Sequence, residues 1–205
     1  MQVGISEVLS LTIEAYDPQT STYTSSPNLS MYIRPDNFGT ASARITADTN
    51  APYGYQLLID NINHNNALVE QHDNPSSPVD PVISSITNNV TINDSTDSTK
   101  AFPTNNWGYA LVTNNNPTNA APTIPLTYSP IPTTSTNITS TETKGTYTYD
   151  FTTGTRVDMS LPAGIYQDEL MFTIIANAKP STPSFYNVHY MPYRRHQGSY
   201  RQIRL

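Results

Sequence analysis

The chain has 205 residues, of which 36% are hydrophobic and only 13% are charged, and its formal net charge is −6. The absence of cysteine excludes disulfides, thiolate zinc sites and cysteine nucleophiles. Four of the ten cationic side chains fall after residue 188, whereas every acidic side chain precedes residue 170, so the acidic body is not attracted to nucleic acid or anionic lipid.

The first part of the chain is dominated by a period-two alternation of apolar and polar residues, which is typical of half-buried strands. The pattern predicts a strand over residues 3–15, with a bulge or an edge near its middle. A short strand is expected at 31–34 and a longer one at 40–49. A proline turn follows, and we expect residues 53–59 to form a hairpin with the strand at 40–49.

Residues 60–80 are polar and irregular and are interpreted as a loop, in which 67–70 form either one helical turn or a brief strand. Residues 82–92 are strand-like and predict a further strand. Residues 105–111, which include the only tryptophan, predict the next one.

The stretch around the tryptophan has two very different faces. Trp107 and Tyr109 fall on one face of an extended chain, whereas Gly108 and Ala110 fall on the other. Such a pattern predicts a central strand that crosses the core and has another backbone close behind its small face. The strand expected at 53–59 has a similar pattern and is also interpreted as central.

Residues 114–144 are rich in proline and predict a long connection with one or two edge strands, since proline is excluded from the middle of a sheet. Alternation then predicts strands over 146–151, 157–161 and 166–177, and no helical periodicity of useful length occurs. The predicted fold is all-β, an antiparallel β-sandwich of the immunoglobulin-like or jelly-roll-like kind, with long loops rich in proline, threonine and asparagine. Its predicted core consists of Tyr55, Leu57, Trp107, Tyr109, Leu111, Tyr149, Phe151, Val157, Leu170, Phe172 and Ile174.

The composition changes near residue 178, and this change predicts the domain organisation. The sandwich module is expected to occupy residues 1–178, followed by a linker at 179–184 and a basic tail at 185–205. The tail opens with a strand pattern that has nothing downstream to pair with, so it is interpreted as truncated or irregular, or as the start of a second small β repeat.

Three stretches, 50–57, 105–111 and 157–166, read Asn-Ala-Pro-Tyr-Gly-Tyr-Gln-Leu, Asn-Asn-Trp-Gly-Tyr-Ala-Leu and Val-Asp-Met-Ser-Leu-Pro-Ala-Gly-Ile-Tyr. In order and spacing they resemble the motifs of a β-rich module of predicted secreted surface proteins from ultrasmall candidate-phyla bacteria of the Saccharibacteria type. The resemblance covers about residues 3–178 and implies an extracellular location and attachment to a host cell, without an established activity or site residues. Since the chain opens directly into a strand pattern, we expect its export signal upstream.

Residues 185–190, Phe-Tyr-Asn-Val-His-Tyr, are similar to the opening strand of small surface repeats of listerial internalins (the Listeria–Bacteroides type). In those repeats an Asn-Gly-Gly turn follows the strand, whereas Met-Pro-Tyr-Arg-Arg stands at 191–195 here. The resemblance therefore implies at most a stub of a repeat. One hypothesis is that the tail from Pro192 is a frame-shifted or truncated reading of it.

The sequence contains few arrangements suited to catalysis. Asp168 and Glu169 are adjacent in a predicted strand, so they point to opposite faces and do not form an acid and base pair. His64 and His72 share a polar loop, but their eight-residue spacing matches no common zinc pattern. Neither a Gly-x-Ser-x-Gly elbow nor a phosphate-binding glycine loop occurs. The sequence predicts no enzyme and no cofactor; a hydrolase is kept as an alternative that needs two carboxylates brought together by the fold.

Two sets of residues are candidates for binding. Asp94 and Asp97 offer oxygen ligands for calcium, against the alternative that residues 93–97 form ordinary Asx turns. Four tyrosines lie off the core alternation and would stack on sugar rings if they were exposed together. These tyrosines are Tyr16, Tyr23, Tyr128 and Tyr166.

The first functional hypothesis is a non-enzymatic extracellular structural or adhesion module of a bacterial cell-surface protein, with a cell-surface protein or glycan as its partner. The second is a carbohydrate-binding module that uses exposed tyrosines, with or without calcium. No nucleic-acid partner is expected. Because no apolar run approaches the ~18 residues of a transmembrane helix, the chain is not expected to span a membrane.

Overall fold

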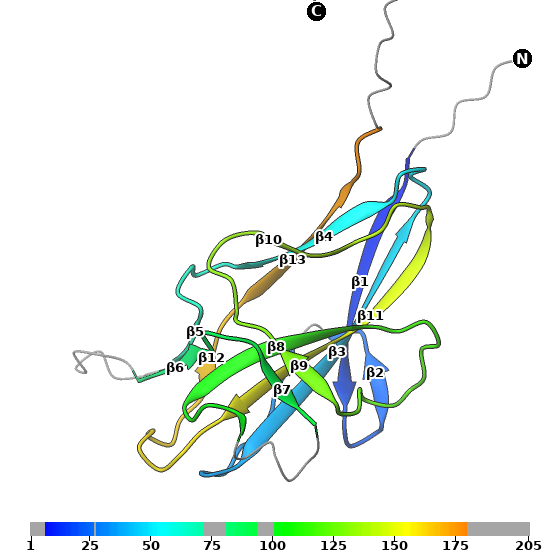
Figure 1. Cartoon of the computed structure of the whole chain (residues 1–205). Helices are drawn as coiled ribbons and strands as arrows, with labels where there is room; N and C mark the ends of the chain where they lie inside the picture. The colour runs from blue at the N-terminus through cyan, green and yellow to red at the C-terminus, as the bar shows by residue number, and fades with distance from the viewer. Residues whose placement is uncertain (1–6, 27, 72–80, 94–100, 180–205) are drawn as a thin grey trace, which may run out of the picture.

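The computed structural model describes residues 7–26, 28–71, 81–93 and 101–179 (Figure 1). Within these ranges the ordered elements are thirteen β-strands, so the predicted all-β class is confirmed. The strands are β1 (Leu9–Asp17), β2 (Thr22–Thr24), β3 (Phe38–Thr49), β4 (Tyr55–Asn61), β5 (Ala67–Glu70), β6 (Val82–Ser85), β7 (Val90–Ile92), β8 (Asn106–Thr113), β9 (Leu126–Tyr128), β10 (Thr136–Ser140), β11 (Gly145–Arg156), β12 (Tyr166–Gln167) and β13 (Leu170–Ala176).

The strands form three sheets that pack as a sandwich with an added flap. The largest sheet has eight strands in the order β12-β5-β6-β8-β11-β3-β1-β2 and is curled like half of a barrel. A three-stranded sheet, β10-β4-β13, covers one of its faces, and a two-stranded sheet, β7-β9, covers part of the other. Every pairing among the described strands is antiparallel except that of β6 with β8.

The longest ladder joins β3 and β11, which pair in register over the full twelve residues of each strand. Residue numbers that face each other across this ladder are both odd or both even, so each face of the sheet receives one set. The odd-numbered side chains face the three-stranded sheet. The even-numbered ones face β7 and β9 at one end and a polar loop farther along.

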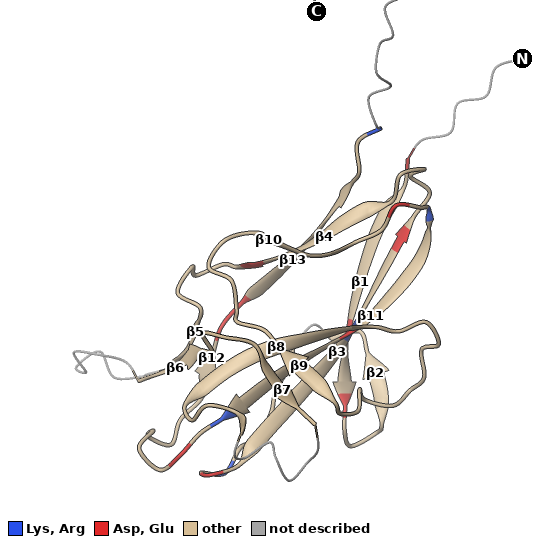
Figure 2. Cartoon of the chain, viewed as in Figure 1, with Lys and Arg blue, Asp and Glu red and all other residues tan. Residues whose placement is uncertain are grey.

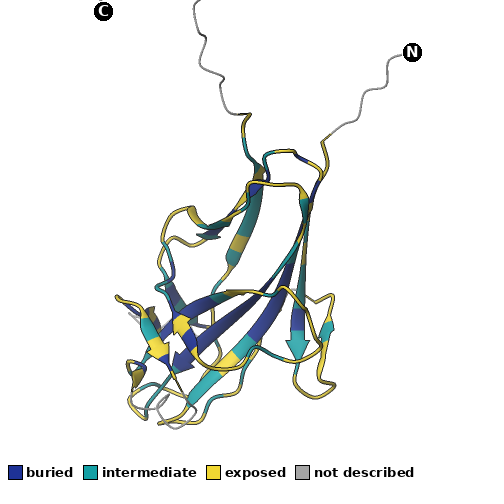
Figure 3. Ribbon diagram, turned by 45° about the vertical axis from the view of Figure 1, so that its right-hand side comes forward, coloured by how far each residue is buried: buried dark blue, intermediate teal, exposed yellow. Residues whose placement is uncertain are grey.

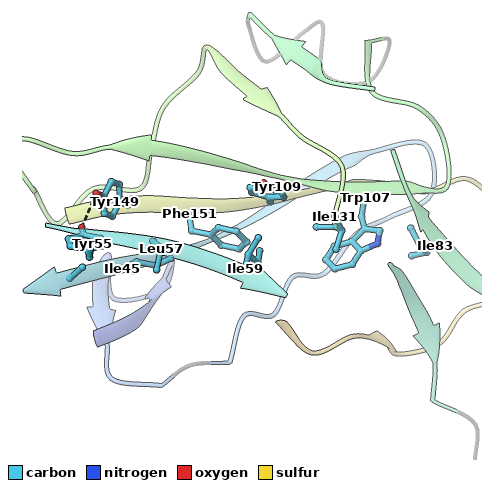
Figure 4. Close-up of a cluster of buried hydrophobic side chains, with 11 residues drawn as sticks. Ile45, Tyr55, Leu57, Ile59, Ile83, Trp107, Tyr109, Ile131, Tyr149 and Phe151 are labelled. Carbon is cyan, nitrogen blue, oxygen red and sulfur yellow. Dashed lines mark hydrogen bonds between the residues drawn. The ribbon is translucent and has the colours of Figure 1, made fainter. Parts of the chain in front are cut away.

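The main core lies between the eight-stranded and three-stranded sheets. Tyr55 and Leu57 of β4 are completely buried there against Tyr149 and Phe151 of β11 (Figures 3 and 4). The buried hydroxyls of Tyr55 and Tyr149 hydrogen-bond to each other at 2.9 Å, and the Trp107 indole donates to the Asn66 carbonyl at 3.1 Å, so these polar atoms are satisfied. Of the eleven residues expected in the core, six are buried and five are partly buried and pack against it.

The second core lies on the opposite face, beneath β7 and β9. Phe38, Phe102 and Tyr128 pack there with ring centroids 4.9–5.7 Å apart. Gly108 of β8 has no room for a side chain, because a Cβ atom would lie 2.9 Å from the Ser129 carbonyl oxygen. A backbone therefore passes close behind the small face of β8, as its sequence pattern predicts.

The predicted hairpin between residues 40–49 and 53–59 is wrong. β3 and β4 follow each other in the chain but belong to different sheets. At the connecting turn Gly54 has a φ of 69°, and a Cβ atom there would lie 2.3 Å from the Thr141 carbonyl oxygen. The glycine lets the turn pack tightly against this backbone while the chain crosses from one sheet to the other.

Several other boundaries differ from the predicted ones. Residues 31–34 form no strand, and residues 157–161 form a turn because β11 ends at Arg156. The stretches 82–92 and 166–177 each divide into two strands that lie in different sheets. The polar connection at 114–144 does contain two short strands, β9 and β10, at the edges of their sheets.

A substitution at Gly154 tests the packing of the second core. A Cβ atom at this position would lie 2.5 Å from the ring of Tyr128 and 2.7 Å from that of Phe38. We expect Gly154→Ala to lower the free energy of unfolding by about 1–3 kcal/mol, because the rings must shift. Urea denaturation measures this loss. Ser10→Ala, at an exposed strand position, is the control, and equal stability of the two variants would contradict the described packing.

Candidate functional site

A buried ion pair lies on the even-numbered face of the β3–β11 ladder. Arg44 and Asp150 are direct partners in the register, and their side chains are only 9% and 7% exposed. The Arg44 Nε donates to Asp150 Oδ1 at 3.2 Å, and a terminal guanidinium nitrogen donates to the Thr118 carbonyl at 2.7 Å. Most side chains of β3 and β11 are uncharged (Figure 2), and Glu14 of β1 is the register partner of Arg44 on its other side.

The carboxylate of Asp150 also receives a hydrogen bond from a neighbouring element. Asn114, just after β8, donates its side-chain amide to the second carboxylate oxygen of Asp150. Its backbone amide donates to the Thr148 carbonyl at 2.8 Å, which holds it in place. Both oxygens of the buried carboxylate are thus engaged, as a buried charge requires.

An aromatic pair covers the other side of the arginine. The guanidinium carbon of Arg44 lies 3.9 Å from the centroid of the Tyr23 ring, and the Tyr16 ring meets Tyr23 edge-on at 5.3 Å. The Tyr23 hydroxyl donates to the Ala120 carbonyl at 3.3 Å. Burial, followed by the nearby Asp150 charge, raises the pKa of Tyr23 to about 12. Tyr23 therefore stays a neutral donor at physiological pH, and its stacking on Arg44 is a cation–π contact.

A hollow of about 340 Å³ opens beside this centre, between the end of β8 and the loop at 114–125. Its size is at the lower end of the range for small-molecule sites. Uncharged amides, hydroxyls and proline rings make up most of its wall, and Asp150 also lines it. Because Arg44 neutralises Asp150, the hollow is polar but not strongly charged, which suits a neutral polyhydroxylated ligand better than an ion.

The four candidate tyrosines do not form one binding platform. Tyr16 and Tyr23 come together, but Arg44 already occupies a face of the Tyr23 ring. Tyr128 is completely buried in the second core, so it is unable to stack on a ligand. Tyr166 belongs to β12 in the eight-stranded sheet and donates its hydroxyl to the Pro162 carbonyl at 2.9 Å.

The candidate metal and acid residues are also placed apart. Asp94, Asp97 and His72 lie outside the described residues, and within those residues no group of three or more His, Asp or Glu side chains is arranged to hold a metal ion. Asp168 stands between β12 and β13, where it accepts a hydrogen bond from the Asn63 side chain at 2.9 Å, and the Glu169 amide donates to it at 2.8 Å. Asp168 is thus a hydrogen-bond acceptor within the connection between β12 and β13.

Sequence reasoning missed the Arg44–Asp150 centre. Both residues fall on faces expected to be polar and solvated, and 106 residues separate them. The available signal was the small number of charged residues in these strands, which are Arg44 and Asp48 in β3 and Asp150 and Arg156 in β11.

Comparison with protein-family models, curated proteins and solved structures finds no match to this chain. The resemblance to surface modules of candidate-phyla bacteria therefore stays a prediction. Among the described residues, no helix has the length and apolar character needed to cross a membrane.

Removing one member of the ion pair tests its contribution to the fold. We expect Arg44→Met to lower the free energy of unfolding by about 3–5 kcal/mol, because it leaves Asp150 buried without its cation. The double variant Arg44→Met/Asp150→Leu should recover most of this loss, since neither charge then remains buried. Urea denaturation of the single variants, the double variant and the exposed control Arg34→Met provides the comparison. Additive losses would show that the two residues are not coupled.

Proposed function

We propose that the chain is a non-enzymatic, extracellular structural and adhesion module of a bacterial cell-surface protein. The observation that supports it most is that both described ends of the chain meet at one turn. The Asn50 amide donates to the Val8 carbonyl at 3.3 Å, and the Asn177 amide donates to the Gly54 carbonyl at 3.0 Å. We call this end of the molecule the tethered pole.

The opposite end is the distal pole, formed by residues 32–37, 103–105 and 157–160 (Figure 1). The Asp36 amide donates to the Val157 carbonyl at 2.8 Å and joins two of these segments. A spacer within a stalk has its two ends at opposite poles, whereas both ends leave this fold at the tethered pole. The distal pole therefore points away from the attachment, which favours adhesion over in-line spacing.

The distal pole carries an apolar side chain on a turn that is held by several hydrogen bonds. Asn105 and Asp158 exchange two hydrogen bonds of 3.0 Å, and the hydroxyl and amide of Ser160 also donate to Asp158. These bonds, led by the Ser160 hydroxyl, lower the pKa of Asp158, so it stays an ionised acceptor. In this turn the Met159 side chain is 82% exposed. Tyr32, in the segment 32–37 of the same pole, is 89% exposed. Exposed apolar side chains are suited to contact with a protein surface.

The Arg44–Asp150 centre supports the non-enzymatic part of the proposal. Both oxygens of its carboxylate are engaged by Arg44 and Asn114, so Asp150 is poorly placed to move a proton to or from a substrate. Its position under the loop at 114–125 instead fits a role in holding that loop on the sheet.

Binding of the full chain to cells tests adhesion through the distal pole. The protein is coupled through its N-terminus to fluorescent beads, and bead retention is measured on sibling and host-type bacterial cells. We expect Met159→Asp and Tyr32→Asp each to lower retention about fivefold or more, since both place a charge in an apolar contact. Ile62→Asp, at a 42% exposed position away from the distal pole, should bind normally. Retention that none of the variants changes would contradict the proposal.

The hollow beside Asp150 favours a second candidate function, which is recognition of a neutral glycan. Its wall contains Thr113, Asn116 and Thr123, whose amide and hydroxyls match the donors and acceptors of a sugar. Its proline rings, including Pro122, offer apolar surface for the faces of a sugar ring. In this role Asn116 is the residue we expect to contact the ligand, because it is exposed at the wall.

A glycan array probed with the full chain, with and without calcium, tests this second function. We expect Asn116→Ala to weaken binding to any neutral glycan found about three- to tenfold, the effect of losing one or two hydrogen bonds. Asn88→Ala, an exposed asparagine in the 86–89 turn, is the matched control. Equal binding by the two variants, or an array without signal, would contradict glycan recognition at the hollow.

A further inference from the structure

Strand β13 differs from the other strands that end the described sheets. The edge strands β2 and β12 have three and two residues, and β7 and β9 have three each. The edge strand β10 is interrupted by a register shift between Asn137 and Thr139. β13 has seven residues, Leu-Met-Phe-Thr-Ile-Ile-Ala, which pair in unbroken register with β4 and include neither a charge nor a proline. Short length, bulges and charges are the usual means by which proteins block an edge, and β13 has none of them.

The backbone groups of β13 that face the open edge follow from its pairing with β4. The Asn177 amide donates to Gly54, and the Ile62 amide donates to the Glu169 carbonyl, so the odd-numbered residues form the hydrogen-bonded pairs with β4. Because such pairs alternate in an antiparallel ladder, the even-numbered residues of β13 direct their amides and carbonyls to the other side. No other described strand pairs with that side, although β1 of the eight-stranded sheet approaches β13.

The side chains of β13 are also incompletely covered. Met171 and Ile175 point outward and are 47% and 49% exposed. Phe172 and Ile174 point toward the main core but are only partly buried, whereas Leu57 in the neighbouring β4 is fully buried. The edge thus offers apolar surface on both faces together with unpaired backbone groups, and this combination accepts an added strand.

We propose that β13 pairs with β13 of a second copy of the chain, antiparallel and about a two-fold axis at Thr173. This register places Phe172 opposite Ile174, and these even-numbered residues are the ones whose backbone groups face outward. It places Met171 opposite Ile175 on the outer face. Every cross-strand pair except the central threonines is apolar, and all seven residues of each strand take part.

The charges that flank β13 support the antiparallel direction and the identity of the partner. Asp168 and Glu169 precede the strand, and Lys179 follows it. Pairing about Thr173 brings Lys179 of each copy opposite Gln167, beside the two acids of the other copy. A parallel arrangement would instead place like charges together at both ends of the strand.

A cysteine at the two-fold axis tests the register directly. The chain contains no cysteine. In the proposed dimer Thr173 lies opposite Thr173 of the second copy in a non-hydrogen-bonded pair, whose Cα separation of about 4.5 Å fits a disulfide. We expect Thr173→Cys to form a covalent dimer under mild oxidation, as measured by non-reducing electrophoresis of the full chain. Thr136→Cys, on the opposite edge strand β10 of the same sheet, should remain mainly monomeric. Equal cross-linking of the two variants overturns the proposal.

Sedimentation equilibrium of the unmodified chain and a charge variant provides the second measurement. We expect a reversible dimer whose dissociation constant rises about tenfold or more in Thr173→Lys, because two lysines then stand directly opposite each other. An equimolar mixture of Thr173→Lys and Thr173→Glu should regain the affinity of the original chain. A chain without substitutions that stays monomeric up to its solubility limit overturns the proposal. A dimer unaffected by Thr173→Lys also overturns it.

Discussion

The in-register ladder between β3 and β11 is the constraint on which the rest of the structure depends. Because its two strands match over their full length, their odd-numbered residues form one continuous apolar surface. The even-numbered residues form a second surface, which is apolar beneath Tyr128 and polar around Arg44. The three-stranded sheet, the flap of β7 and β9 and the loop at 114–125 each cover one part of these surfaces. A shift of one residue would exchange the two faces and remove all three contacts.

The sequence predicted the strands better than their partners. Alternation identified the strands at 40–49 and 105–111, and the small face of Gly108 and Ala110 correctly indicated a backbone behind β8. Periodicity, however, describes only which side chains share a face, and not the sheet to which a strand belongs. In the stretch 166–177 the only interruption of the apolar face is Asp168, and it marks the point where the chain leaves one sheet for another. The hairpin expected across Gly54 fails for the same reason.

The polar centre was beyond sequence reasoning because it depends on pairing between distant strands. Arg44 and Asp150 each occupy a position that is solvated in most antiparallel sheets with one open face. Their burial follows from the loop at 114–125, whose composition predicted only a long connection. Tyr23 shows the same dependence: its sequence position made it a candidate for sugar stacking, and the arginine beneath its ring gives it a different neighbour.

The tethered pole and the open edge of β13 have a joint consequence. The carboxyl end of β13 runs directly into the tethered pole, where the Asn177 amide donates to Gly54. In an antiparallel pair of β13 strands the two tethered poles therefore lie at opposite ends of the dimer. Two copies anchored on one surface have their tethered poles on the same side, so they would pair in this way only if both lay parallel to that surface. Two copies anchored on opposed surfaces have their tethered poles on opposite sides, as the pair requires. The geometry of the pair thus favours contact between cells over clustering on one cell, which joins the proposed dimer to the proposed adhesive function.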